Sequence, residues 1–335
     1  MASEVIAKVI RGETVESVHR GHLIVLDGDG QTVLSAGEPS TVTFTRSAAK
    51  PFQAVPLLKS GAAEAFEFSD EEVALACGSH SGEGRHIRVV QLMLEHTGLS
   101  EAHLRCGAHL PFDEKEAERM QREGEHPTQL HNNCSGKHAG MLAVAKHLGE
   151  DLATYDEASH PVQLAILDAV SLLTGVAERD IAIAVDGCAA PNFALPLAAM
   201  ARGFMSLIRP PESFDAATRA AAERIVNVMA RFPELVGGTD RLDTILMQAA
   251  EGRIISKIGA EGIWLCGVLP SDHYPTGLAI ALTVEDGDDR RARPVTAVAV
   301  LKRLGILPDD AFPELSPMPV KNRRGDVVGR VEAVL

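Results

Sequence analysis

The sequence predicts an α+β protein in which both ends of the chain build an antiparallel sheet flanked by helices, with a mostly helical domain inserted between them. Three observations support this fold class. Apolar strand patterns separated by turn residues occupy the start of the chain. Helical periodicity then dominates from Ser69 to about Ala250, and strand patterns return from Arg253 to the end.

The length and composition fit a folded chain of about two domains. The chain has 335 residues, of which 45% are hydrophobic and 23% are charged. This balance is typical of globular proteins, in which a domain usually has about 150 residues. We expect a sheet domain formed by residues 1–60 and 245–335, a helical domain formed by residues 61–244, and an active site between them.

The first elements are marked by clear local signals. Residues 22–37, HLIVLDGDGQTVLSAG, read as two short strands around a DGDG turn, which is typical of a β-hairpin. Ser69 and Glu72 form a capping box ahead of an apolar run and indicate the start of a helix. Further helices are predicted at residues 113–123, 137–148, 162–173 and 214–230.

One strand interrupts the helical stretch, and several follow it. Ile181–Val185 is an apolar strand that delivers Asp186, Gly187 and Cys188 at its end. The later strands are predicted at residues 253–259, 262–269, 277–284 and 326–335, with a helix near residues 295–304.

The charge and hydropathy of the chain argue against several classes of partner. There are 46 acidic and 32 basic side chains, which give a formal net charge of -14. A surface of this sign repels phosphate backbones and anionic lipids, so we expect neither nucleic-acid nor membrane binding. The longest uncharged stretch, residues 187–201, is shorter than the about 20 residues that a membrane-spanning helix needs. The amino terminus lacks an uninterrupted signal-peptide core, so we expect a cytosolic protein.

Ser47 and Lys50 form an S-x-x-K motif where the first strands end and a helix begins. Residues i and i+3 share a helical face, so the lysine amine can reach the serine hydroxyl. An uncharged lysine can take the serine proton and make the serine a nucleophile toward an acyl carbon. The spacing is equally typical of a serine N-cap followed by a solvated lysine. Pro51 predicts an irregular start to this helix.

Two further segments could take part in the same chemistry. The loop Gly78–Gly82, GSHSG, has small residues that let a backbone approach a ligand, and the hydroxyls of Ser79 and Ser81 could relay protons. The loop could also be an ordinary turn that ends the preceding helix. Lys257 and Gly259 lie on the strand that reopens the sheet, where a lysine on an inward face needs a function. The glycine would permit a substrate to lie along the strand edge.

The five cysteines are an odd number without a C-x-x-C pair, so we expect no disulfide framework. Cys134 opens the helix at residues 137–148, where the helix dipole favours a thiolate, and Cys188 follows the internal strand. Two thiolates with neighbouring histidine, lysine or aspartate side chains would suit Zn²⁺. Buried structural cysteines are the alternative.

The order S-x-x-K, serine loop and K-x-G resembles the layout of penicillin-binding proteins and serine β-lactamases. A wider set of motifs is more specific: RSAAKPFQ (46–53), CGSHSGE (77–83), HNNCSGKHAGML (131–142), DGCAAP (186–191) and SKIGAEG (256–262). Together these motifs resemble the rhizobial-type, class 3 L-asparaginases, whose fold is similar to that of serine β-lactamases and glutaminases. The resemblance covers nearly the whole chain.

The resemblance implies an activity, a metal and an assembly. The activity is hydrolysis of L-asparagine to L-aspartate and ammonia, by a homodimer. The implied catalytic pairs are Ser47 with Lys50 and Ser79 with Lys257. The implied zinc ligands are Cys134, Lys137 and Cys188, with Asp186 beyond them.

We expect a mechanism that proceeds through an acyl-enzyme. Ser47 would attack the side-chain amide carbon with Lys50 as general base, and Ser79 would pass a proton to the departing ammonia. The backbone N–H groups of Ser47 and Ala260 would bind the oxyanion. Zinc would order the site rather than activate water. The candidates for binding the α-carboxylate and α-amino groups of the substrate are Arg46, His138 and Asp186.

Two other classes of function remain open from the sequence. The same residues could serve a glutaminase, an esterase or a β-lactamase-like hydrolase, since one extra methylene changes specificity by only about 1–3 kcal/mol. The protein could instead be a non-catalytic zinc or amino-acid sensor. In that case Ser47→Ala would leave the response to ligand intact.

Overall fold

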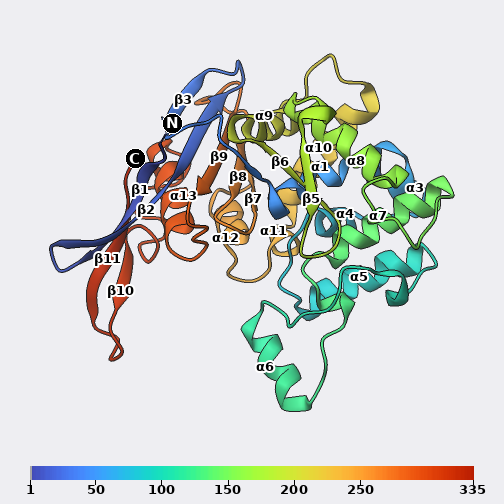
Figure 1. The fold of residues 1–335 in the computed structure, drawn as a ribbon, viewed down its shortest axis with the longest axis horizontal. Coiled ribbons are helices and arrows are strands. Elements are labelled where there is room, and N and C mark those ends of the chain that lie inside the picture. The colour runs from blue at the N-terminus through green and yellow to red at the C-terminus, as the bar shows by residue number, and fades with distance from the viewer. Residues whose placement is uncertain (1) are drawn as a thin grey trace. The chain divides into compact units, whose positions relative to one another are not determined.

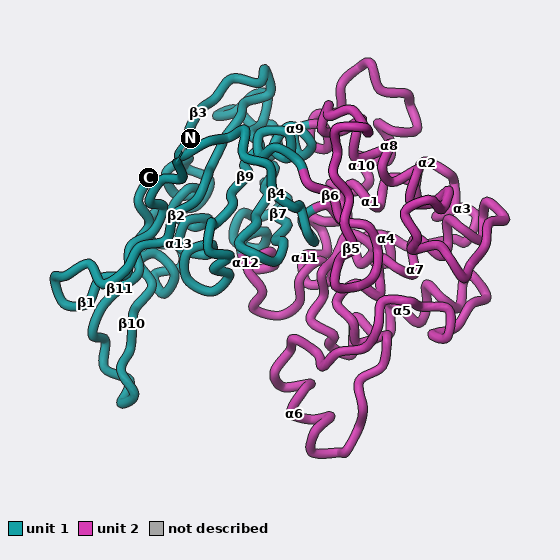
Figure 2. The backbone as a smooth tube through the Cα atoms, in the orientation of Figure 1, with its two compact units in different colours: residues 1–48, 195–205, 246–335 teal, residues 49–194, 206–245 magenta. Residues whose placement is uncertain are grey.

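The computed structural model describes residues 2–335, and the chain forms two compact units (Figure 2). Unit 1 contains residues 1–48, 195–205 and 246–335, and unit 2 contains residues 49–194 and 206–245. We describe each unit by itself.

Unit 1 carries an eight-stranded antiparallel sheet with the order β10-β11-β1-β2-β9-β8-β7, and β3 pairs with β2. The pairing of β1 with β11 joins the two ends of the chain, as the sequence predicts (Figure 1). The strands are β1 (Glu4–Arg11), β2 (Thr14–Asp27), β3 (Thr32–Ala36), β7 (Ile254–Ile258), β8 (Trp264–Val268), β9 (Leu278–Val284), β10 (Met318–Lys321) and β11 (Val327–Ala333).

The core of unit 1 lies between this sheet and helix α13 (Ala292–Arg303), which packs against β1, β9 and β11. Strands β7, β8 and β9 are buried along their whole length. Trp264 is fully buried there, and its indole N–H donates a hydrogen bond to the hydroxyl of Ser256 over 2.9 Å. A polar atom on the inner face of β7 is thus satisfied within the core.

Unit 2 is mostly helical, and α7 (Ser135–Leu148) is its central helix (Figure 1). It contacts α2, α3, α4, α5 and α8, and its residues from Ser135 to Ala145 are all buried. Gly136 explains this close packing, since a Cβ there would lie 2.7 Å from the carbonyl oxygen of Leu75. The packing also buries Lys137 and His138, which a helix at the surface would leave in water.

The remaining elements complete the chain. The α-helices are α1 (Lys50–Gln53), α2 (Val55–Lys59), α3 (Ala62–Ala65), α4 (Asp70–Ala76), α5 (Gly84–His96), α6 (Glu114–Glu123), α8 (Pro161–Thr174), α9 (Leu197–Ile208), α10 (Ala216–Arg231), α11 (Pro233–Val236) and α12 (Leu242–Ala249). The other strands are β4 (Val42–Phe44), β5 (Ala182–Val185) and β6 (Pro191–Pro196). Short 3₁₀ helices are η1 (Arg46–Ala49), η2 (Glu101–His103), η3 (Gln129–His131) and η4 (Glu178–Asp180).

The α+β class and the helical insertion are confirmed, but the unit boundaries differ from those predicted. The first boundary lies after residue 48 rather than residue 60, because α1 and α2 pack against α8 and α10 of the helical unit. Residues 195–205 join unit 1, although the sequence places them within the helical domain. Among the described residues, no helix has the length and apolar character required to cross a bilayer.

Candidate active site

Ser47 and Lys50 lie in one uninterrupted helical segment. The 3₁₀ turn η1 contains Ser47 and leads directly into α1, which begins at Lys50. Pro51 stands in the first turn of α1, and the irregular helix start predicted from it is confirmed. Arg46 has φ of 49°, a left-handed conformation that is strained for a side chain of this size. The strain lies directly before the predicted nucleophile.

The glycine of the K-x-G motif has a packing role within unit 1. A Cβ on Gly259 would lie 2.7 Å from the carbonyl oxygen of Thr45 and 3.2 Å from the Cβ of Arg46. The end of β7 therefore passes close to the segment that carries Ser47. Lys257 on the same strand is fully buried, and its Nζ donates to the carbonyl of Ile258 over 3.0 Å.

Arg46 has a partner of opposite charge in this region. Its guanidinium lies 3.8 Å from the carboxylate of Glu261, in the turn that also contains Ala260. Glu261 is largely exposed, so this ion pair contributes little to stability.

Lys50 is fully buried in unit 2 and makes two defined hydrogen bonds there. Its Nζ donates to Ser79 Oγ over 2.9 Å and to the carbonyl oxygen of Asn133 over 3.0 Å. Burial lowers the pKa of Lys50 below its ordinary value, and repulsion from Lys137 acts in the same direction. The nearby thiol groups of Cys134 and Cys188 oppose this shift without reversing it. The environment thus favours the uncharged amine.

The loop that carries Ser79 is held by its own chain rather than left open for a ligand. The backbone N–H of Ser79 donates to the carbonyl of Val236 over 2.7 Å. A Cβ on Gly78 would lie 2.6 Å from the carbonyl oxygen of Leu235, so only glycine fits. The small residue next to Ser79 therefore permits contact with α11, and it fixes where the hydroxyl stands.

The two predicted cysteine ligands meet in unit 2, although 54 positions separate them in the sequence. Cys134 is the N-cap residue of α7, and Cys188 lies in the turn after β5. Lys137 Nζ is 3.1 Å from Cys188 Sγ, and Asp186 Oδ2 is 3.9 Å from the same sulfur. The thiols of both cysteines and the amine of Lys137 are buried. The predicted zinc ligands are thus brought together.

The charges in this cysteine cluster are strongly coupled. A hydrogen bond from Cys134 and the positive charge of Lys137 lower the pKa of Cys188, although burial acts against them. The same hydrogen bond and burial raise the pKa of Cys134. Burial acts to lower the pKa of Lys137, but the charges of Cys188, Cys134 and Asp186 outweigh it and raise the pKa. The shifts of the two cysteines are thus opposite in direction, although both thiols are buried.

His138 belongs to the edge of the cysteine cluster. Its Nδ1 lies 2.7 Å from the hydroxyl of Tyr155. Its Nε2 is buried and has no hydrogen bond of normal geometry within residues 2–335, and Cys188 is an electrostatic neighbour of the ring. Burial lowers the pKa of His138, with Cys188 acting in the opposite sense. This fully buried position distinguishes His138 from the partly exposed Arg46 and Asp186.

The donor atoms of the cluster fit zinc. Thiolate sulfur is a preferred zinc ligand, and a lysine amine becomes a donor when it loses its proton. Among residues 2–335, histidine, cysteine and acidic side chains alone form no group of three that could hold a metal. The amine of Lys137 lies beside Cys188, and the unsatisfied His138 Nε2 is a further buried nitrogen close to the cluster.

Asn133 is the residue of this site to which the sequence assigned no role. Its side-chain Nδ2 donates to Ser79 Oγ over 3.0 Å, and its carbonyl accepts the bond from Lys50. A signal was present, because Asn133 directly precedes Cys134 in the motif HNNCSGKH. The contact itself joins residues 54 positions apart, so only the fold could reveal it.

Comparisons with known proteins agree with these observations. The family described as L-asparaginase II matches residues 7–333. The fold is similar to a probable glutaminase from Bacillus subtilis, at 12% identity over 86% of this chain and 85% of that chain, with a TM-score of 0.41. It is also similar to a class A β-lactamase from Mycobacterium abscessus, at 14% identity over 86% and 94%, with a TM-score of 0.38. No curated protein matches the chain. Scores this low carry nothing about the chemistry of the site.

Proposed function

The chain belongs to the L-asparaginase II family, and from this premise we propose that it is an amidohydrolase that converts L-asparagine to L-aspartate and ammonia through a serine acyl-enzyme. The family supports hydrolysis of an amide. The choice of asparagine and the assignment of residues are our proposal.

The observation that supports it most directly is the environment of Lys50. An uncharged lysine amine keeps two N–H groups and one lone pair. The bonds to Ser79 Oγ and to the Asn133 carbonyl can use both N–H groups, and the side chain of Cys134 is a third polar neighbour of the amine. Burial lowers the pKa in the direction that a general base requires.

The reaction would proceed in two steps. Lys50 takes the proton of Ser47, whose Oγ bonds to the side-chain amide carbon and gives a tetrahedral oxyanion held by the N–H groups of Ser47 and Ala260. The carbon–nitrogen bond then breaks, and ammonia leaves with a proton relayed through Ser79. Water hydrolyses the resulting β-aspartyl ester, releases L-aspartate and returns the proton to Ser47. Lys257 would contribute a buried positive charge on β7.

Recognition of the substrate needs both charges of an amino acid to be met. Arg46 would bind the α-carboxylate, since its own partner Glu261 is exposed and weakly held. Asp186, which is partly exposed, would bind the α-amino group. His138 is the third candidate from the sequence, and its burial against Tyr155 favours a role in supporting the cysteine cluster instead.

We propose that Cys134, Lys137 and Cys188 hold zinc. When bound, zinc would supply positive charge that orders the site and helps to orient the substrate. Its sulfur and nitrogen ligands would link α7 to the turn after β5 within unit 2. The serine nucleophile needs no metal-bound hydroxide.

An ammonia-release assay tests the proposed function. Wild type should release ammonia from L-asparagine, and Ser47→Ala should lose turnover by a factor on the order of 10³ or more while remaining folded. Ser213→Ala is the matched control, because Ser213 is exposed and lies outside the site.

The same assay separates the alternatives. Faster turnover of L-glutamine, an ester or nitrocefin would change the substrate but keep the mechanism. Turnover by Ser47→Ala equal to wild type would contradict the nucleophile. Binding of asparagine by the wild type without any turnover would indicate a sensor.

We also infer that the protein forms a homodimer through β5. This strand is an edge of its sheet, and each of its residues, Ala182 to Val185, is exposed and uncharged. Val185 has 78% of its surface exposed. Natural proteins usually protect such an edge with charged residues or proline, so an unprotected apolar edge suits pairing with another strand. Antiparallel pairing of two β5 strands, one from each chain of the dimer, would cover this edge.

A further inference from the structure

We propose that His109 is a positioning residue that acts through Asn133 to set the orientation of the Ser79 hydroxyl beside Lys50. The inference concerns residues of unit 2 alone. It deepens the proposed amide hydrolysis and rests on it for its effect on rate.

Asn133 contacts both members of the Lys50–Ser79 pair. Its carbonyl accepts from Lys50 Nζ over 3.0 Å, and its Nδ2 donates to Ser79 Oγ over 3.0 Å. The Ser79 oxygen therefore accepts two hydrogen bonds, one from Lys50 and one from Asn133. With both lone pairs occupied, its own O–H must point elsewhere. A proton donor to a leaving amine needs this arrangement.

His109 in turn holds Asn133. His109 Nδ1 lies 2.6 Å from the carbonyl oxygen of Leu110, so Nδ1 carries the proton that it donates to that carbonyl. Nε2 is then an acceptor, and the backbone N–H of Asn133 donates to it over 3.1 Å. The side-chain oxygen Oδ1 of Asn133 lies 3.2 Å from the same nitrogen. Because Nε2 carries no proton in this tautomer, it cannot donate to Oδ1, and the hydrogen bond from the backbone N–H is the one by which His109 holds Asn133.

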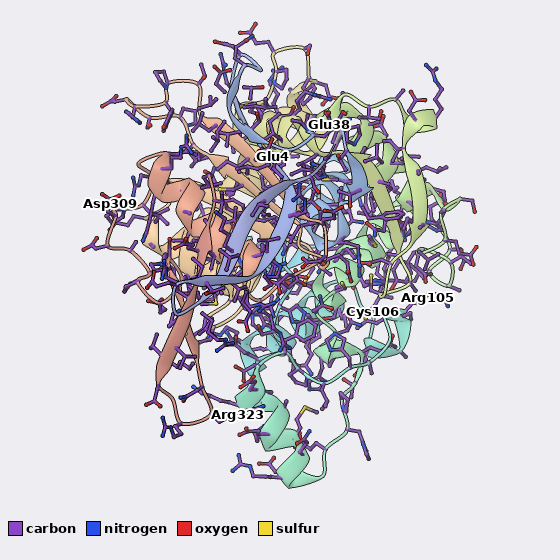
Figure 3. All side chains as sticks on the ribbon, turned by 60° about the vertical axis from the view of Figure 1, so that its left-hand side comes forward. Glu4, Glu38, Arg105, Cys106, Asp309 and Arg323 are labelled. Atoms are coloured by element: carbon purple, nitrogen blue, oxygen red, sulfur yellow. The ribbon has the colours of Figure 1, made fainter. Side chains whose placement is uncertain are left out.

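The loop that carries His109 is anchored at its start. Arg105 pairs with Asp156 over 2.7 Å, and the carbonyls of Cys106 and Gly107 accept from Asn132 Nδ2 over 2.8 and 3.1 Å. Figure 3 labels Arg105 and Cys106 on this loop. Asn132 neighbours Asn133, so the same segment of chain is held from two directions.

The far end of the loop and the ring of His109 are also fixed. The N–H of Asp113 donates to the carbonyl of Ser81 over 3.0 Å. The His109 ring stacks on the Phe112 ring, with the two ring centroids 4.9 Å apart. The guanidinium of Arg241 lies 5.3 Å from the centroid of the Phe112 ring. Because His109 is only partly buried, these contacts rather than complete burial hold its ring. The side chain is therefore pre-organised to act on Asn133.

Three variants test the inference. His109→Ala removes the acceptor, and we expect kcat for L-asparagine to fall about 10- to 100-fold with KM changed by less than about threefold. His109→Gln places a carbonyl oxygen near the position of Nε2, so it should restore kcat to within about fivefold of wild type. Leu110→Ala is the matched loop control, because this exposed side chain changes while its carbonyl is kept.

A crystal structure of His109→Ala supplies a readout that does not depend on activity. We expect Asn133 to rotate so that its Nδ2 lies beyond 3.5 Å from Ser79 Oγ, the limit of a normal hydrogen bond. An unchanged Asn133–Ser79 bond, or an unchanged kcat, would overturn the inference. So would equal losses in His109→Ala, His109→Gln and Leu110→Ala, which would indicate a structural role alone. If wild type hydrolyses no amide, the proposed function fails, and the position of Asn133 still decides whether His109 orients it.

Discussion

The buried amine of Lys50 has an environment that can be read from its neighbours. Burial excludes water from the amine, and the positive charge of Lys137 disfavours a second positive charge on Lys50. The N–H groups of the amine donate to Ser79 Oγ and to the carbonyl oxygen of Asn133. The thiol groups of Cys134 and Cys188 act in the other direction. Any metal bound to these sulfurs would neutralise their negative charge and favour the uncharged amine further.

The lowered pKa of Lys50 makes a prediction about the pH dependence of kcat. The active form of a general base is the deprotonated one, so kcat should rise with pH through the pKa of Lys50 and level off above it. Because that pKa lies below the ordinary value of 10.5, the midpoint should be lower than 10.5. A pH profile of kcat from steady-state ammonia release measures it.

Lys50→Arg and Lys50→Met are the matched variants for this test. Arginine keeps its charge and should lower kcat about 10²- to 10⁴-fold without a rising limb. Methionine removes a buried amine that is costly to desolvate, so the free energy of unfolding in urea should stay equal or increase. A normal rising limb in Lys50→Arg would show that another group is the base.

At this scale the sequence predicts which residues are reactive, but it does not reveal the contacts that these residues make. The S-x-x-K spacing and the serine loop predict that Ser47, Lys50 and Ser79 are reactive, because the residue types in a short motif indicate the chemistry that they could perform. The hydrogen bonds from Lys50 to residues 29 and 83 positions away depend on how helices pack. His109 was missed for this reason, since its loop has no motif of its own.

Strand β7 packs closely against the segment that leads into η1, which contains the proposed nucleophile Ser47. Gly259 lets the end of β7 approach Thr45 and Arg46, which directly precede Ser47. The sequence suggested that this glycine gives a substrate access to the strand edge. The close approach of the protein's own backbone is a second and sufficient reason for it.

Gly259→Ala should therefore disturb both stability and activity. The added Cβ would lie 2.7 Å from the Thr45 carbonyl oxygen, so we expect a loss of about 1–3 kcal/mol in the free energy of unfolding and a lower kcat. Gly84→Ala is the control, because a Cβ there meets nothing within 4 Å at the start of α5. Urea unfolding and the ammonia assay measure both; equal stability of the two variants would contradict the packing argument.

The β5 edge makes a prediction about assembly. Val185→Lys places a charge on an exposed apolar strand, so dimerisation should weaken on the order of 10- to 100-fold. Sedimentation velocity across a range of concentrations measures the change. Val327→Lys is the control, since Val327 is 65% exposed on β11, an interior strand of the larger sheet. A wild type that stays monomeric at high concentration would remove the proposed dimer.

Elements with strong local signals were predicted well, and those without were missed. The capping box at Ser69 and the left-handed glycine at the end of α7 mark real helix ends. Strand β6 begins and ends with proline and is buried, so its pattern does not alternate. Strand β10 is short and contains Pro319, and neither strand has a periodicity that sequence alone can detect.

Zinc binding should be visible in the stability of the whole molecule. A ligand that binds only the folded state at about 100 times its Kd should raise the Tm of a 335-residue chain by roughly 3–5 °C. Cys188→Ser should lose most of this increase, and metal analysis should give about one zinc per wild-type chain. Cys266→Ser is the control, because Cys266 is also fully buried but lies on β8 of unit 1.

The removal of zinc also tests whether the metal orders the site or takes part in the chemistry. Removal of zinc should weaken activity or raise KM rather than abolish acylation, because Ser47 rather than a metal-bound hydroxide is the nucleophile in the proposed mechanism. Loss of all single-turnover acylation after clean removal, with restoration by zinc, would show that the metal takes part in the chemistry. An equal loss of the zinc-dependent Tm increase in both cysteine variants would place the metal elsewhere.

At the scale of the molecule, the two-unit organisation could be predicted, but its boundaries could not. Strand patterns at both chain ends predict a shared sheet, and the pairing of β1 with β11 realises it. The exact assignment of residues 49–60 depends on helix packing within unit 2 rather than on composition. The boundary after residue 48 falls inside the S-x-x-K motif, where no linker signal exists.

The pairing of β1 with β11 has a consequence for how the protein is made. A ribosome adding about 5–20 residues per second needs roughly 15–60 s to extend the nascent chain from the first strand to the last. During that time β1 can form its hairpin with β2, but its other edge has no native neighbour. Polypeptides released early, by a premature stop codon or a broken message, would keep that edge open and become substrates for chaperones and proteases.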